Sequence, residues 1–144
     1  MKATIPRLTL YVIPGGGPET NKPFKAAASF FKHMPLMTLH IIDHNDLNDF
    51  NDSIQTPWFG YVMSNEWLDD DLSRSIPIFL ESGHFDCLVL MQKQVDAEGK
   101  ARVFEVPRIF KTKNVRIQKW SLMPEHPEKL KYERALNGWL IIGS

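Results

Sequence analysis

The chain has 144 residues, of which 43% are hydrophobic and 24% charged, and its formal net charge at pH 7 is zero. This length suits one domain with a single sizeable core, and the large apolar fraction excludes a disordered chain. No apolar run is long enough for a membrane helix and residues 1–10 lack a signal-peptide core, so we expect a cytoplasmic protein without a membrane span. The single cysteine, Cys87, excludes a disulfide framework and is expected to be a small buried hydrophobe.

Charge is unevenly distributed along the chain. Residues 1–99 contain 13 of the 17 acidic and 7 of the 17 basic residues, so residues 100–144 are strongly basic. Between Asp43 and Asp71 there are eight acidic side chains and no Lys or Arg. Carboxylates facing Arg or Lys could form a metal and diphosphate site; alternatively, the two halves neutralise each other across the fold or across a subunit contact. Nucleic-acid binding has no motif here, and the neutral total charge argues against it.

The first elements alternate between strand and helix patterns. Residues 8–13 form an apolar run rich in β-formers, and the glycine-rich loop at residues 14–18 lacks the spacing of a phosphate-binding fingerprint. The Ala-rich residues 24–34 predict a short helix, and residues 37–42 predict a second strand. The Asn- and Asp-rich residues 44–55 predict a loop with room for one helical turn.

The centre of the chain has the clearest pattern. Residues 58–63 are an apolar strand that stops at the polar residues Ser64, Asn65 and Glu66, and an amphipathic helix follows. The apolar face of that helix consists of Leu68, Leu72, Ile76, Phe79 and Leu80. In an open α/β sheet, a polar step at the carboxyl end of a strand is where ligands usually bind.

After this helix the pattern predicts a strand and then a hairpin. Gly83 would cap the helix, and residues 85–92 are a nearly continuous apolar strand that should lie inside the sheet. Residues 96–100 predict a turn, and residues 101–106 alternate as the return arm.

The carboxyl-terminal residues mix several patterns. Residues 115–120 alternate like a short strand, residues 129–137 are helix-prone, and residues 138–142 form an apolar anchor. The order of all these elements predicts one α/β domain over residues 1–144, with a three-layer mixed sheet that is parallel at first and gains antiparallel strands later.

Two segments carry a family resemblance. Residues 57–90, PWFGYVMSNEWLDDDLSRSIPIFLESGHFDCLVL, run from an aromatic strand through an acidic step to a helix and a strand, and residues 106–111 read VPRIFK. This arrangement resembles the middle of GT-A-type family 2 glycosyltransferases. The resemblance implies a truncated nucleotide-diphospho-sugar transferase (GT-A)-like fold, with the first two strands as its nucleotide-binding half.

The metal-binding DxD step of that family is degenerate in this chain. Alignment on Glu66 and Leu68 places its two aspartates at Met63 and Asn65. In the family this step holds a divalent cation that neutralises the donor diphosphate, and a Met thioether is a poor ligand for Mn²⁺ or Mg²⁺. The resemblance therefore implies a weakened Mn²⁺ or Mg²⁺ site at Asn65 and Glu66, with Glu66 also the catalytic candidate.

Three further residues would bind the donor if the resemblance holds. Asp43 would lie near the nucleotide, Arg108 could bind the diphosphate bidentately, and Trp58 could stack on the base or the sugar. The alternatives are that Arg108 pairs with one of the central aspartates and that Trp58 belongs to the core.

Two functions remain open. The first is a glycosyltransferase-like protein that binds a nucleotide-sugar donor or transfers its sugar, with activity reduced or lost through the altered step. No motif singles out a catalytic base among Glu125, Glu128 and Glu133. The alternative is a non-catalytic viral or phage-type structural or assembly protein that uses the same fold as a scaffold, forms homo-oligomers or binds a virion partner, and is incorporated in the virion.

Overall fold

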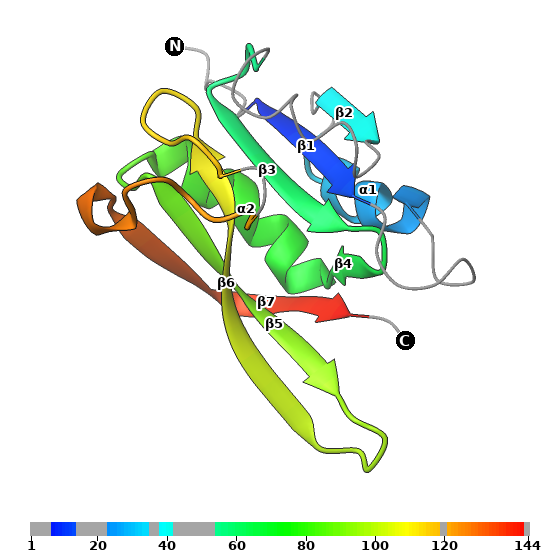
Figure 1. The fold of residues 1–144 in the computed structure, drawn as a ribbon. Coiled ribbons are helices and arrows are strands. Elements are labelled where there is room, and N and C mark those ends of the chain that lie inside the picture. The colour runs from blue at the N-terminus through cyan, green and yellow to red at the C-terminus, as the bar shows by residue number, and fades with distance from the viewer. Residues whose placement is uncertain (1–6, 14–22, 35–37, 42–53, 119–120, 143–144) are drawn as a thin grey trace.

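The computed structural model describes residues 7–13, 23–34, 38–41, 54–118 and 121–142 (Figure 1). Its strands are β1 Leu8–Ile13, β2 Thr38–Ile41, β3 Trp58–Met63, β4 Glu66–Leu68, β5 Cys87–Val95, β6 Ala101–Lys111 and β7 Tyr132–Ile142. Its helices are α1 Pro23–Phe31, α2 Asp70–Ser82 and the short 3₁₀ helix η3 Pro127–Lys129. None of these helices is long and apolar enough to cross a membrane.

The strands form one mixed seven-stranded sheet in the order β2-β1-β3-β6-β5-β7-β4. The strands β2, β1 and β3 are parallel, β6 is antiparallel to both β3 and β5, and β7 is parallel to β5. The α/β class and the change from parallel to antiparallel pairing are therefore confirmed. The predicted bounds of β1 and β3 agree with the structure, whereas the three-residue strand β4 was not expected.

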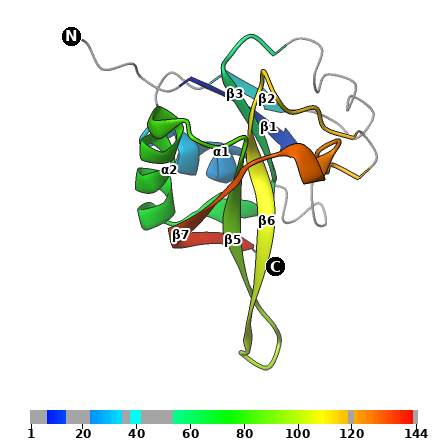
Figure 2. The same cartoon turned by 90° about the vertical axis from the view of Figure 1, so that its left-hand side faces the viewer.

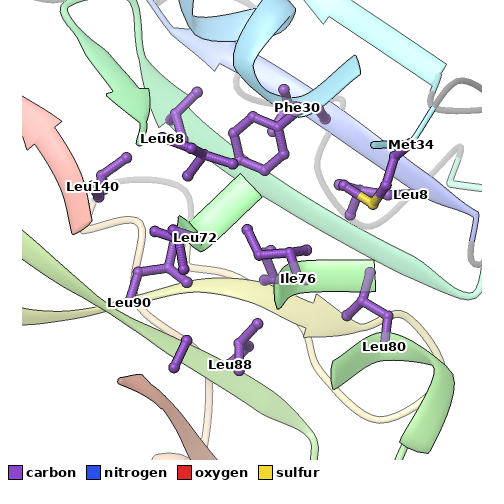
Figure 3. Close-up of a cluster of buried hydrophobic side chains, with 14 of the residues drawn as sticks. Leu8, Phe30, Met34, Leu68, Leu72, Ile76, Leu80, Leu88, Leu90 and Leu140 are labelled. Atoms are coloured by element: carbon purple, nitrogen blue, oxygen red, sulfur yellow. The ribbon is translucent and has the colours of Figure 1, made fainter. Parts of the chain in front are cut away.

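The central helix α2 is set by its ends and by one apolar stripe. Asp69 caps its amino terminus by accepting a hydrogen bond from the Leu72 N–H at 2.9 Å, and Gly83 ends it in the left-handed conformation (φ 64°). Leu72, Ile76 and Leu80 are buried as the spacing predicts (Figure 3). Leu68, expected on this helical stripe, is buried from β4 instead.

Both α-helices lie on the same face of the sheet (Figure 2). They share a core with one side of β1, β3 and β5, where Leu8, Trp58 and Leu88 are buried. The other side is covered by irregular chain, because Val115 and Ile117 pack there with Phe59 and Phe110. The expected third helical layer is thus absent from the described residues, and an irregular segment takes its place.

Cys87 belongs to this second cluster and is fully buried. Burial, together with the charge of Asp86, raises the pKa of the Cys87 thiol to about 12. The thiol therefore stays protonated at neutral pH and behaves as the expected small hydrophobe.

Two predictions near the carboxyl terminus are wrong. Residues 115–118, the described part of the expected strand, contribute only an isolated bridge between Ile117 and Pro124. Residues 129–137 do not form the expected helix, because η3 ends at Lys129 and β7 begins at Tyr132. The reason is tertiary: β7 supplies the parallel neighbour of the buried strand β5, and this pairing overrides the local helix propensity.

Candidate functional site

The site predicted from sequence lies where the parallel strands end. In the pairing register, Val12 of β1 is opposite Ile41 of β2, and Ile13 is opposite Met63 of β3. The Ser64 N–H donates a hydrogen bond to the Ile13 carbonyl oxygen at 2.8 Å, so the polar step begins directly beside the end of β1. The glycine-rich loop and Asp43 follow β1 and β2 in the chain, but both lie outside the described residues.

Glu66, the first residue of β4, is turned inward at this edge. Its side chain is 1% exposed, and its carboxylate accepts four hydrogen bonds. Arg108 donates from Nη1 to Oε1 at 2.5 Å and from Nη2 to Oε2 at 2.9 Å. The Met63 N–H donates to Oε1 at 2.7 Å, and Gln92 Nε2 donates to Oε2. Both carboxylate oxygens are therefore occupied by protein donors.

Arg108 reaches Glu66 from an irregular part of β6. The register between β5 and β6 shifts between Leu88 and Val89, so that Ile109 and Pro107 face these residues and Arg108 lies between them. The Arg108 side chain is 9% exposed, and its guanidinium carbon lies 4.9 Å from the centre of the Tyr61 ring. The cation is thus held by a carboxylate and an aromatic face at once.

Tyr61 completes this buried cluster from β3. Burial raises the pKa of its phenol, which the positive charge of Arg108 lowers and the negative charge of Glu66 raises. Its hydroxyl donates to the Leu122 carbonyl oxygen at 2.9 Å, which ties the sheet to the irregular segment on its other face. Glu66, Gln92, Arg108 and Tyr61, called here the ion-pair cluster, therefore join four strands.

The structure brings Glu66 and Arg108 together, but as partners of each other. The alternative expectation was that Arg108 pairs with one of the central aspartates, but its partner is Glu66. Asn65, the other residue of the implied metal site, lies half-buried in the turn between β3 and β4. Among the described residues, no group of three or more His, Cys, Asp or Glu side chains could hold a metal ion.

Trp58 occupies the core at the opposite end of β3. It is 5% exposed, and its ring lies 5.0 Å from that of Phe85, centre to centre. The Lys111 ammonium lies 5.3 Å from the same ring. These contacts agree with the alternative that Trp58 belongs to the core.

Sequence reasoning missed Gln92 and Tyr61. Gln92 stands at the end of the apolar run CLVLM, is 6% exposed, and also accepts a hydrogen bond from Gln94 at 2.9 Å. A glutamine amide at the end of a buried strand needs polar partners, so its position after this apolar run could have indicated a buried polar cluster. Tyr61 gave no comparable signal, because a tyrosine in an apolar strand is usually core.

When the sequence is compared with known proteins, no family model matches it and no curated protein is significantly similar to it.

Proposed function

We propose that this chain is a non-catalytic protein built on a GT-A-like scaffold, and that it acts by binding other protein surfaces in an assembly. The order of β3, polar step, α2, β5 and the Arg108 segment of β6 agrees with the order of elements on which the resemblance rests. The scaffold would therefore be kept while the chemistry at the step is replaced.

The proposed loss of catalysis rests on one observation: both oxygens of the Glu66 carboxylate already accept hydrogen bonds from protein donors. A metal ion or an acceptor hydroxyl at this carboxylate would have to displace Arg108 or Gln92. Leaving one member of a buried ion pair without its partner costs about 3–5 kcal/mol. With Met63 and Asn65 in the aligned aspartate positions, little coordination energy remains to offset that cost.

A second candidate is donor binding without transfer. It is favoured by the adjacent carboxyl ends of the parallel strands β1, β2 and β3, the place where open α/β sheets bind ligands. In that case Asp43 would contact the nucleotide, and the surface would serve as a sensor of nucleotide sugars.

Titration calorimetry separates the two candidates. Uridine and guanosine diphosphate sugars would be titrated into the protein at millimolar concentration, with and without Mn²⁺. We expect no saturable heat in the calorimeter. We also expect no free sugar when the same mixtures are assayed separately for release of sugar from the donor. Saturable heat with a nucleotide sugar would replace the first candidate by the second, and Mn²⁺-dependent release of sugar would contradict the loss of catalysis.

A further inference from the structure

The β5–β6 hairpin extends beyond the body of the protein (Figures 1 and 2). β3 pairs with β6 only at residues 109–111, and β7 pairs with β5 only as far as Lys93. In the described part of the chain, residues 101–106 of β6 therefore have a strand neighbour on one side only. An open edge of this kind is a template for pairing with another chain.

The exposed arm of β6 combines apolar and basic side chains. Val103 is 52% exposed and Phe104 is 43% exposed, and Lys100 and Arg102 are exposed beside them. Residues 100–104, KARVF, are called here the arm. Glu105, which follows the arm, is held by Arg134 at 2.8 Å, so its charge is already balanced.

A groove of matching character lies between α2 and β7. Its deeper part is a pocket of about 370 Å³ with Ile78, Phe79 and Phe85 in its lining, at the lower end of the range of roughly 300–1,000 Å³ for ligand pockets. Ile78 lines this pocket, and Leu136 lines an adjoining hollow that shares Ser75 and Asn137 with it. The Ile78 and Leu136 side chains are 67% and 71% exposed. Because Ile78, Phe79 and Phe85 line one pocket, the apolar surface is contiguous there, and contiguous apolar patches mark interaction sites.

The groove offers a strand edge as well as apolar surface. β4 pairs with β7 only at residues 140–142, so Tyr132–Ala135 has no strand on its outer side among the described residues. Side chains of α2 form the facing wall, which leaves a channel bounded by a helix and a strand. A small molecule could fill the pocket, but only an extended backbone could also pair with this edge.

Charge favours a basic occupant. Asp71 and Glu133 bring exposed carboxylates to the groove. Arg74 also lines it, but its guanidinium is held by Asp70 at 2.7 Å. The groove therefore combines apolar surface with the carboxylates of Asp71 and Glu133, whereas the arm combines apolar side chains with Lys100 and Arg102. The two surfaces are complementary in charge.

We propose that the groove of one copy of this protein binds the arm of a second copy. The arm adds as a strand beside β7. Side chains alternate between the two faces of a strand, so Lys100, Arg102 and Phe104 share the face toward α2, and Val103 lies on the opposite face. Phe104 covers Ile78 and Leu136, and the two cations lie near Asp71 and Glu133. Because arm and groove are different surfaces of one molecule, the contact is head-to-tail and generates a ring or an open filament. This inference deepens the proposed assembly function and rests on it.

Sedimentation velocity over a range of concentrations tests the interface with two double variants. The arm variant is Val103→Glu/Phe104→Glu, and the groove variant is Ile78→Glu/Leu136→Glu. All four positions are exposed, so both variants should keep the circular dichroism spectrum of the wild type. Met123→Glu makes the same change at a 46% exposed position outside both surfaces and serves as the matched control.

We expect the mass of the wild type and of Met123→Glu to rise with concentration, and each double variant to associate at least tenfold more weakly. An equimolar mixture of the two variants should form dimers and nothing larger, because it contains one intact arm and one intact groove per pair. A monomeric wild type, unaltered association of either variant, or a mixture that stays monomeric would each overturn this interface.

These outcomes are separable from those of the proposed function. If the wild type associates but neither variant changes its association, the arm and groove are wrong while assembly proceeds through another surface. Saturable binding of a nucleotide sugar in calorimetry would instead replace the proposed assembly function by donor binding, and it would leave the sedimentation result intact.

Discussion

Replacing Glu66 by Gln should lower the free energy of unfolding by about 3–5 kcal/mol, because it leaves the buried Arg108 guanidinium without its counter-charge. Glutamine has nearly the shape of glutamate, so the change tests charge and not volume. Glu66 is 1% exposed and accepts hydrogen bonds from Arg108, Gln92 and the Met63 N–H. In Glu66→Gln one carboxylate oxygen becomes an NH₂ group. That NH₂ group would face protein hydrogen-bond donors, so donors on both sides would lack an acceptor.

Urea denaturation followed by circular dichroism measures this loss, which is a large part of the roughly 5–15 kcal/mol that stabilises a typical domain. Glu81→Gln is the matched control, because Glu81 lies exposed on α2, and surface changes of this kind usually stay within about 0.5 kcal/mol. The double variant Glu66→Gln/Arg108→Met removes both charges but keeps an amide oxygen that can accept from the Met63 N–H or from Gln92. It should recover at least about 2 kcal/mol relative to Glu66→Gln, since the unpaired buried charge is what makes the single variant costly.

A loss below about 1 kcal/mol for Glu66→Gln, or a double variant less stable than the single one, would contradict a solvent-excluded pair of mutually neutralising charges. A loss below about 1 kcal/mol for Glu66→Gln would mean that solvent reaches the ion-pair cluster. Glu66 would then be available to ligands, and the case for a non-catalytic protein would lose its main support.

Two further predictions concern a glycine and a tyrosine. Gly138 has φ 107°, and a Cβ there would collide with the backbone nitrogen of Leu72, so Gly138→Ala should cost at least about 1–3 kcal/mol in urea denaturation. Gly99→Ala also has positive φ, 82°, but meets no atom within 4 Å; an equal loss for both would contradict the clash. Burial raises the pKa of Tyr61 above its ordinary 10.0, so its stabilising effect is present below pH 10 and lost as pH rises through the folded value. Alkaline titration of tyrosinate absorbance should therefore lose a component that ionises above pH 10 in Tyr61→Phe, and an unchanged titration curve would contradict the raised pKa.

Local sequence patterns were sufficient to predict the elements whose structure depends mainly on their own residues. The apolar runs of β1 and β3 and the stripe of Leu72, Ile76 and Leu80 follow directly from side-chain periodicity. Gly83 could be assigned as a helix cap because a left-handed residue is required there. Such features depend on sequence neighbours, which are visible without a fold.

The carboxyl-terminal strand could not be found in this way. Residues 129–137 favour a helix locally, yet β7 extends along β5 from Tyr132, which pairs with Cys87. The energy of that pairing comes from residues far away in the chain, so no local window contains it. The loss of the expected strand at residues 115–118 has the same origin, since Val115 and Ile117 are used to cover the opposite face of the sheet.

The sequence by itself determined that an α/β sheet forms and that Glu66 belongs to the polar step that follows β3. Only the tertiary structure decided what Glu66 does there, because its partner Arg108 lies 42 residues away and reaches it through the shifted register between β5 and β6. A charge turned into a sheet must be neutralised by whatever the neighbouring strands present. Strand order and register therefore convert a candidate ligand into one half of a buried ion pair.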